Sequence, residues 1–192
     1  KGKLDWALIG FYNGDYQKCL NIVKNSMRVA LYQIMFLNKI PVHAAVDESV
    51  EIVKQIQGER TAGIVNAVLR NIHRNMDKIR YPDENEDPVY YYSIIYSHPK
   101  WMVKRWIDRF GVELTKELLE ANNSKPPVTV RVNTLKSNVE KIKEIFDKYQ
   151  VEYVESDLLP NSLLLHSPKY DISSSELFKT GEITIQDVSA SL

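Results

Sequence analysis

The chain has 192 residues, 44% hydrophobic and 26% charged, which is the composition of a soluble globular protein with one large or two small domains. Its 25 basic and 25 acidic side chains cancel, so the net charge gives no general signature of nucleic-acid binding. The single cysteine, Cys19, excludes an internal disulfide bond and favours a reducing compartment, for which we expect the cytoplasm. We expect Cys19 to be a buried packing residue. No apolar run is long enough to span a bilayer, so no membrane partner is expected.

Residues 1–80 predict an all-helical domain. Apolar residues recur at helical spacing from Leu4 to Phe11 and again from Tyr16 to Leu37. Pro41 suits the first turn of the next helix, and Gly58 suits its end. The pattern therefore indicates a helical bundle in this part of the chain.

Basic side chains gather on the helix that follows Gly58. Between Arg60 and Arg80 there are five Lys or Arg residues and one acid. Arg70 and Arg74 lie four residues apart and therefore share a helix face. Such a face can bind RNA phosphates, or it can be an ordinary solvated surface, and charge alone leaves both interpretations open. Our hypothesis assigns Arg70 and Arg74 to RNA binding.

Residues 81–97 predict a linker. Two prolines flank an acidic run from Asp83 to Asp87, and three consecutive tyrosines, Tyr90 to Tyr92, follow. Tyrosines can stack on bases, but such a run more often packs against a neighbouring domain, and we favour packing.

A second basic helix follows the linker. It is expected to start near Pro99 and to end at Gly111, with a further helix from Glu113 to about Ala121. Lys104 and Arg105 are its candidate RNA-binding residues, with a solvated helix face as the alternative.

The last third of the chain predicts a small β-α-β-β-α-β domain, the topology of ferredoxin-like and RNA-recognition folds. Strands are indicated by alternating or short apolar runs and helices by a wider apolar spacing. The predicted elements are a strand at 128–133, a helix at 137–149, strands at 151–154 and 161–166, a helix at 173–179 and a strand at 182–186.

Arg131 and Asn133 are the candidate binding residues of this domain. Arg131 projects from a strand whose other face is valine, so its guanidinium is placed to pair with phosphate or to stack on a base. The alternative is an internal ion pair with Asp187 or Glu182. Asn133 can read a base edge, but a role as a turn or cap before Ser137 is the favoured interpretation. The aromatic pair typical of RNA-recognition motifs is missing, so base stacking on this sheet is not expected.

Catalytic motifs are absent from the pattern. The sequence shows no nucleophilic triad, no glycine-rich phosphate loop and no ligand-like spacing among its four histidines. We therefore expect no catalytic residue, no metal site and no cofactor-binding residue in this chain.

Several separated stretches resemble one family. Val130–Lys136, Ile185–Leu192 and Tyr96–Trp101 resemble segments of the RsmB (Sun, Fmu) family of bacterial ribosomal RNA cytosine-C5 methyltransferases. Ile40–Val50 and Val65–Asn71 resemble the NusB-like domain that opens those proteins and the antitermination factor NusB itself. The family's use of Tyr96–Trp101 implies a structural role that ties two modules together.

The resemblance implies an α+β protein: a NusB-like all-α bundle over residues 1–80, then a helical connector and a ferredoxin-like β-α-β-β-α-β domain over residues 98–192. The catalytic Rossmann domain of the family has no counterpart. The bundle is expected to lack its first helices, which would expose apolar surface on Ile22, Met27, Leu31 or Ile34.

The implied function is RNA binding and substrate positioning for an S-adenosylmethionine-dependent small-subunit ribosomal RNA (cytosine-C5) methyltransferase. In the family the enzyme uses two cysteines and S-adenosylmethionine, so the cofactor is expected in the parent protein and not on this fragment. Small-subunit ribosomal RNA is the implied partner. The alternative is a NusB-like protein and RNA interaction module that acts in transcription regulation through a protein partner. The residues assigned to RNA are Arg70, Arg74, Lys104, Arg105, Arg131 and Asn133.

Overall fold

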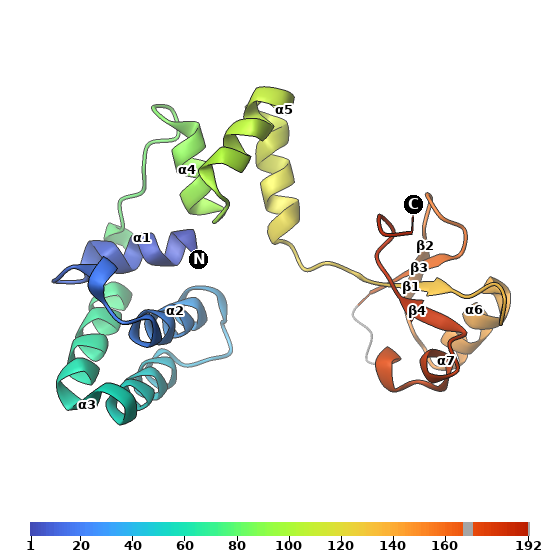
Figure 1. Cartoon of the computed structure of the whole chain (residues 1–192), viewed down its shortest axis with the longest axis horizontal. Coiled ribbons are helices and arrows are strands. Elements are labelled where there is room, and N and C mark those ends of the chain that lie inside the picture. Colours follow the sequence, from blue (N-terminus) through green and yellow to red (C-terminus); the bar gives the residue numbers. More distant parts are fainter. Residues whose placement is uncertain (167–170, 192) are drawn as a thin grey trace. The chain divides into compact units, whose positions relative to one another are not determined.

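The computed structural model describes residues 1–166 and 171–191 and shows two compact units, Lys1–Asn123 and Ser124–Leu192 (Figure 1). The first unit is helical and the second contains the sheet. Leu192, the last residue of one family-like stretch, lies outside the described residues. The second basic helix, which we grouped with the sheet domain, falls within the helical unit.

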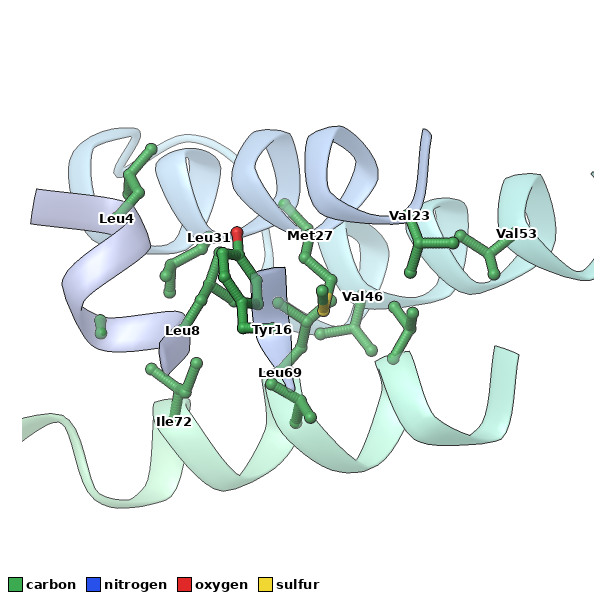
Figure 2. Close-up of a cluster of buried hydrophobic side chains, with 14 of the residues drawn as sticks. Leu4, Leu8, Tyr16, Val23, Met27, Leu31, Val46, Val53, Leu69 and Ile72 are labelled. Carbon is green, nitrogen blue, oxygen red and sulfur yellow. The ribbon is translucent and has the colours of Figure 1, made fainter. Parts of the chain in front are cut away.

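Three helices of the first unit enclose its main core. Leu8 of α1, Met27 and Leu31 of α2, and Leu69 of α3 are fully buried against one another, as Figure 2 shows. Helices α4 and α5 pack together around a smaller core that contains Tyr92. The elements of this unit are α1 (Gly2–Phe11), η1 (Tyr16–Lys18), α2 (Asn21–Phe36), α3 (Val42–Arg74), η2 (Met76–Lys78), α4 (Pro88–Ile95) and α5 (Lys100–Asn123).

Two glycines interrupt the long helices where the sequence predicts helix ends. Gly58 in α3 has φ 78° and ψ 172°, and Gly111 in α5 has φ 79° and ψ 174°. Residues other than glycine rarely adopt this conformation, so each glycine ends one helical run and starts another. The first half of α3 folds back toward the second half as a result.

The predicted helix from Tyr16 to Leu37 starts later than expected. The Asp15 side chain accepts a hydrogen bond from the Gln17 backbone N–H, which closes a single 3₁₀ turn over Tyr16–Lys18. The backbone is extended at Cys19 and Leu20, so the regular helix begins at Asn21.

The interpretation of residues 81–97 as a linker needs correction, because a helix occupies part of it. Asp87 caps α4 by accepting a hydrogen bond from the Tyr90 backbone N–H, and Pro88 fills the first turn. Tyr92 is 1% exposed, and its hydroxyl donates to Glu84 at 2.5 Å. The favoured packing role is thus confirmed for Tyr92.

The expected apolar exposure is wrong for two of the four residues. Met27 and Leu31 are fully buried, because α1 and α3 cover that side of α2. Ile34 is partly buried, and Ile22 is 41% exposed.

The second unit has the predicted ferredoxin-like topology. Its strands form one sheet in the order β2-β3-β1-β4, and every neighbouring pair is antiparallel. Its elements are β1 (Val128–Val132), α6 (Val139–Lys148), β2 (Tyr153–Glu155), β3 (Ser162–Leu165), η3 (Ile172–Ser174), α7 (Glu176–Lys179) and β4 (Ile183–Ile185).

One face of this sheet forms the core and the other carries polar side chains. Val130 and Val132 of β1 are fully buried and pack with Ile142 and Phe146 of α6. Arg131 lies between the two valines in sequence and is exposed on the opposite face. No helix in the described part of the chain has both the length and the apolar character needed to cross a membrane.

Candidate nucleic-acid interface

Arg70 and Arg74 share a pocket on the helical unit. The pocket has a volume of about 370 Å³ and is also lined by His43, His73 and the apolar side chains of Val42 and Val46. His43 reaches this place because the chain folds back at Gly58. Two guanidiniums and two imidazoles around an apolar floor can hold a nucleotide phosphate.

The two arginines differ in how far their charge is compensated. Arg70 Nε donates to Asn66 Oδ1 at 2.6 Å, and Arg70 Nη2 lies 3.3 Å from Asp47 Oδ1. Both members of that ion pair are more than half exposed, so water screens the attraction. Within the described residues no carboxylate forms an ion pair with Arg74.

Lys104 and Arg105 lie side by side in sequence on α5 but have different partners. Lys104 Nζ is 2.8 Å from Asp108 Oδ2, an exposed pair one helical turn apart. The Arg105 guanidinium lies over the indole ring of Trp101, 5.4 Å from its centroid. Of these two residues, only Arg105 has no acidic partner among the residues described.

Among the residues that the structure describes, Arg131 forms no ion pair, so the alternative of an internal ion pair with Asp187 or Glu182 is wrong. Its Nη1 donates to the neutral Gln186 Oε1 at 3.3 Å. Glu182 pairs with Lys141 at 2.8 Å, which lowers the pKa of that carboxyl. Asp187 accepts hydrogen bonds from Ser189, which lower its pKa in the same way.

Asn133 has the favoured structural role. Its Nδ2 donates to the Gly181 carbonyl at 2.9 Å, and its Oδ1 accepts from the Leu135 backbone N–H at 3.2 Å. These two hydrogen bonds join the turn after β1 to the segment before β4, which is the turn role favoured from the sequence, and a contact to a base edge stays a prediction. It still lines a pocket of about 250 Å³ with Arg131, Thr184 and Gln186.

The structure thus brings the six predicted residues together in pairs. Arg70 and Arg74 share one pocket, Lys104 and Arg105 share the first half of α5, and Arg131 and Asn133 share another pocket. A role in RNA binding stays a prediction for all of them. No cluster of three or more His, Cys, Asp or Glu side chains suited to a metal ion occurs within the described ranges.

Three residues near these cations were not among the predicted RNA-binding residues. His43 and His73 complete the pocket of Arg70 and Arg74. Trp101 was assigned a structural role, but it is 60% exposed. Closeness in sequence could have indicated two of them, because His73 is next to Arg74 and Trp101 lies four residues before Arg105. No such signal exists for His43, which is far from both arginines in sequence.

Two family models match the chain, one in each part. Residues 1–74 match the NusB family, and residues 98–173 match the ferredoxin-like domain of RsmF/B-like methyltransferases. The second match starts in the helical unit and continues through most of the sheet unit.

Curated relatives match the chain over nearly all its length. It is 36% identical over 190 residues to the probable ribosomal RNA small subunit methyltransferase B of Bacillus subtilis (strain 168), covering 98% of this chain and 41% of that protein. It is 28% identical over 188 residues to ribosomal RNA small subunit methyltransferase B of Proteus mirabilis (strain HI4320), covering 98% of this chain and 42% of that protein. The chain therefore spans about two fifths of the length of these relatives.

A solved structure supports the fold. The crystal structure of PH0851 superposes with a TM-score of 0.62 at 22% identity and covers 86% of this chain and 36% of that one.

Proposed function

We propose an RNA-binding function for this chain, which combines a NusB-family domain over residues 1–74 with an RsmF/B-like ferredoxin-like domain over residues 98–173. The relatives named above are ribosomal RNA small subunit methyltransferases. The chain is accordingly the part that holds and positions small-subunit ribosomal RNA while another region of the protein methylates a cytosine at C5. The cytoplasm is the compartment that this function requires.

S-adenosylmethionine, the cofactor that such a methylation requires, does not fit the residues of this chain. Nucleotide cofactors are typically held at the carboxyl ends of parallel strands, where a glycine-rich turn leads into a helix. Every strand pair described here is antiparallel. At Gly181, the glycine nearest the sheet site, a Cβ atom would lie 3.0 Å from the Lys136 ammonium, so a lysine side chain already occupies the space beside this glycine. We therefore place the cofactor and the reacting cysteines outside this chain.

The observation that carries the proposal is the uncompensated charge of three exposed arginines. Arg74, Arg105 and Arg131 form no ion pair with any carboxylate in the described ranges. A guanidinium without an acidic partner is free to form bidentate hydrogen bonds to phosphate. Arg131 is also held in place from behind by buried valines.

The test replaces one such arginine in each unit. Arg74→Gln and Arg131→Gln each remove one phosphate contact and should weaken binding to a small-subunit ribosomal RNA hairpin by about fivefold, measured by filter binding at low salt.

Two lysines provide matched controls. Lys54 is paired with Glu59 at 2.7 Å and Lys143 with Glu155 at 2.6 Å, so their charge is already compensated. Lys54→Gln and Lys143→Gln should leave the affinity unchanged. If the lysine variants weaken binding as much as the arginine variants, the arginines have no special role and the proposal fails.

A protein partner is a second candidate, favoured by an apolar stripe on α2. Val29, Tyr32 and Phe36 lie at helical spacings of three and four and are 59%, 49% and 46% exposed. Exposed apolar stripes of this kind often mark protein contacts. The test immobilises the chain, treats the sample with nuclease and asks which ribosomal or transcription proteins stay bound. Proteins that bind the wild-type chain but not Tyr32→Ser would support a NusB-like interaction module in transcription regulation.

A further inference from the structure

Trp101 is exposed without a packing role. It is 60% exposed at the start of α5, whereas the other two tryptophans have contacts that hold them. The Trp6 indole N–H donates to the Arg80 carbonyl at 2.8 Å, and Trp106 packs in the α4–α5 core beside His98.

The neighbours of Trp101 in its sequence motif already supply the structural links expected of that motif. The Tyr96 hydroxyl donates to Glu120, and the Ser97 hydroxyl accepts from the Lys3 backbone N–H. His98 Nδ1 lies 2.7 Å from the Tyr96 carbonyl. The motif therefore joins α1, α4 and α5 without help from the indole.

Cations lie against two aromatic rings at this place. The Arg105 guanidinium is 5.4 Å from the centroid of the Trp101 ring, and the Lys100 ammonium is 3.5 Å from that of Tyr90. Trp6 contacts Tyr90 edge-on at 5.7 Å between centroids, which fixes the orientation of that ring. Lys100 and Trp101 are consecutive in the first turn of α5, so both cation and ring pairs lie near the start of this helix, where α4 packs against it.

Much of Trp101 remains accessible to solvent although Arg105 lies over its ring. The guanidinium covers one side of the ring, yet more than half of the residue is exposed to water. A flat apolar ring flanked by positive charge is the arrangement that proteins use to stack single-stranded nucleic acid, because every base has a flat face and is followed by a phosphate.

We propose that Trp101, Arg105, Lys100 and Tyr90 form a stacking site for an unpaired RNA nucleotide. The base lies on the Trp101 indole, and Arg105 and Lys100 contact the flanking phosphates. The site requires an unpaired nucleotide, because the bases inside a duplex already stack on one another. The proposal rests on the RNA-binding function above and specifies which form of RNA one part of the chain recognises.

The test compares an RNA oligonucleotide with a loop of unpaired bases and the same oligonucleotide with abasic positions in the loop. The abasic RNA keeps every phosphate but offers no base to stack. The wild-type chain should bind it about tenfold more weakly, and Trp101→Ala should bind both RNAs equally, at the weaker level. Trp101→Phe, which keeps an aromatic face, should retain part of the preference.

Phe178→Ala is the matched control, because Phe178 is 37% exposed on α7 and has no cation over its ring among the described residues. It should keep the wild-type preference for unpaired bases. Quenching of tryptophan fluorescence by the intact RNA should be reduced in Trp101→Phe.

The outcomes separate this inference from the proposed function. If Trp101→Ala keeps the full preference for the intact loop, the stacking site is excluded even though RNA binding stands. If the wild-type chain binds neither RNA, both proposals are rejected. Trp101→Ala should leave the thermal unfolding midpoint unchanged, since the indole is exposed, so a lost preference cannot be attributed to unfolding.

Discussion

Asp5 in α1 joins two other residues of the helical unit. Its carboxylate accepts hydrogen bonds from Arg28 Nε at 2.6 Å, from Arg28 Nη2 at 2.9 Å and from the Tyr16 hydroxyl at 2.9 Å. Burial alone would raise the pKa of Asp5, but these hydrogen bonds outweigh it and the pKa is lowered. A carboxyl with a lowered folded pKa stabilises the fold above its unfolded pKa of about 3.9, and this stabilisation is lost as the pH falls through the folded pKa.

Asp5→Asn should therefore lower the free energy of unfolding by about 2 kcal/mol at neutral pH, because a charged acceptor is replaced by a neutral one. The difference in the free energy of unfolding between wild type and variant should narrow as the pH falls through the lowered folded pKa of Asp5, where the wild-type carboxyl also becomes protonated. Urea unfolding followed by circular dichroism at several pH values measures it. Asp108→Asn, in an exposed pair with Lys104, should change stability by at most about 0.5 kcal/mol. If the difference in the free energy of unfolding between wild type and Asp5→Asn does not depend on pH, the role given to Asp5 is contradicted.

The predictability of the site differs from residue to residue. Alternation along the first strand correctly placed Arg131 opposite a valine face. Its partner Gln186 could not be predicted, because that contact depends on the register that pairs Arg131 with Thr184. His43 was missed because it meets Arg74 only after the chain folds back.

At the scale of elements, glycines decide where the long helices of the first unit break. Gly58 has a positive φ of 78°, and no heavy atom lies within 4 Å of the place of a Cβ. A side chain there would meet open space, so any cost of a substitution comes from the backbone conformation alone. Gly63, in the second half of the same helix, has no positive φ and equally open surroundings.

Gly58→Ala should lower the free energy of unfolding by about 1–3 kcal/mol, because alanine is strained at this φ and ψ. Gly63→Ala should raise it by about 0.5–1 kcal/mol, since alanine reduces the conformational entropy of the unfolded chain in a position it can adopt. Thermal and urea unfolding of the two variants measures both changes. Equal effects of the same sign would show that the backbone at Gly58 is not under this constraint.

Helix breaks and strands were predictable, whereas one helix was missed. The helix α4 carries ordinary start signals, Asp87 as cap and Pro88 in the first turn, but the acidic run and the two prolines favoured a linker. The helix boundary near Tyr16 was missed because the 3₁₀ turn depends on one local hydrogen bond from Gln17 to Asp15. Apolar spacing alone does not reveal such a bond.

At the scale of the whole molecule, the chain has separate cores in its two units. The core of the first unit lies between α1, α2 and α3, and that of the second lies between the sheet and its helices. Cores that share no residue allow one unit to lose stability without the other. The two family matches also cover different segments, and the second extends across the boundary between the units.

Phe146→Ala tests this independence in the intact chain. Phe146 is fully buried in the core of the sheet unit, so the substitution should cost about 3–5 kcal/mol there. Amide hydrogen exchange should show lost protection in β1, β3 and α6, with α2 and α3 unchanged. Reduced protection in both units would mean that they unfold together.

The salt dependence of RNA binding tests the central claim, that uncompensated arginines hold the phosphates of a ribosomal RNA. Binding of the chain to a small-subunit ribosomal RNA hairpin, measured over a series of salt concentrations, should weaken steeply as salt rises. The combined variant Arg74→Gln, Arg105→Gln, Arg131→Gln should show a logarithmic slope smaller in magnitude by about three, one unit for each lost phosphate contact. An affinity that hardly changes with salt, or a slope that the combined variant leaves intact, would contradict the account.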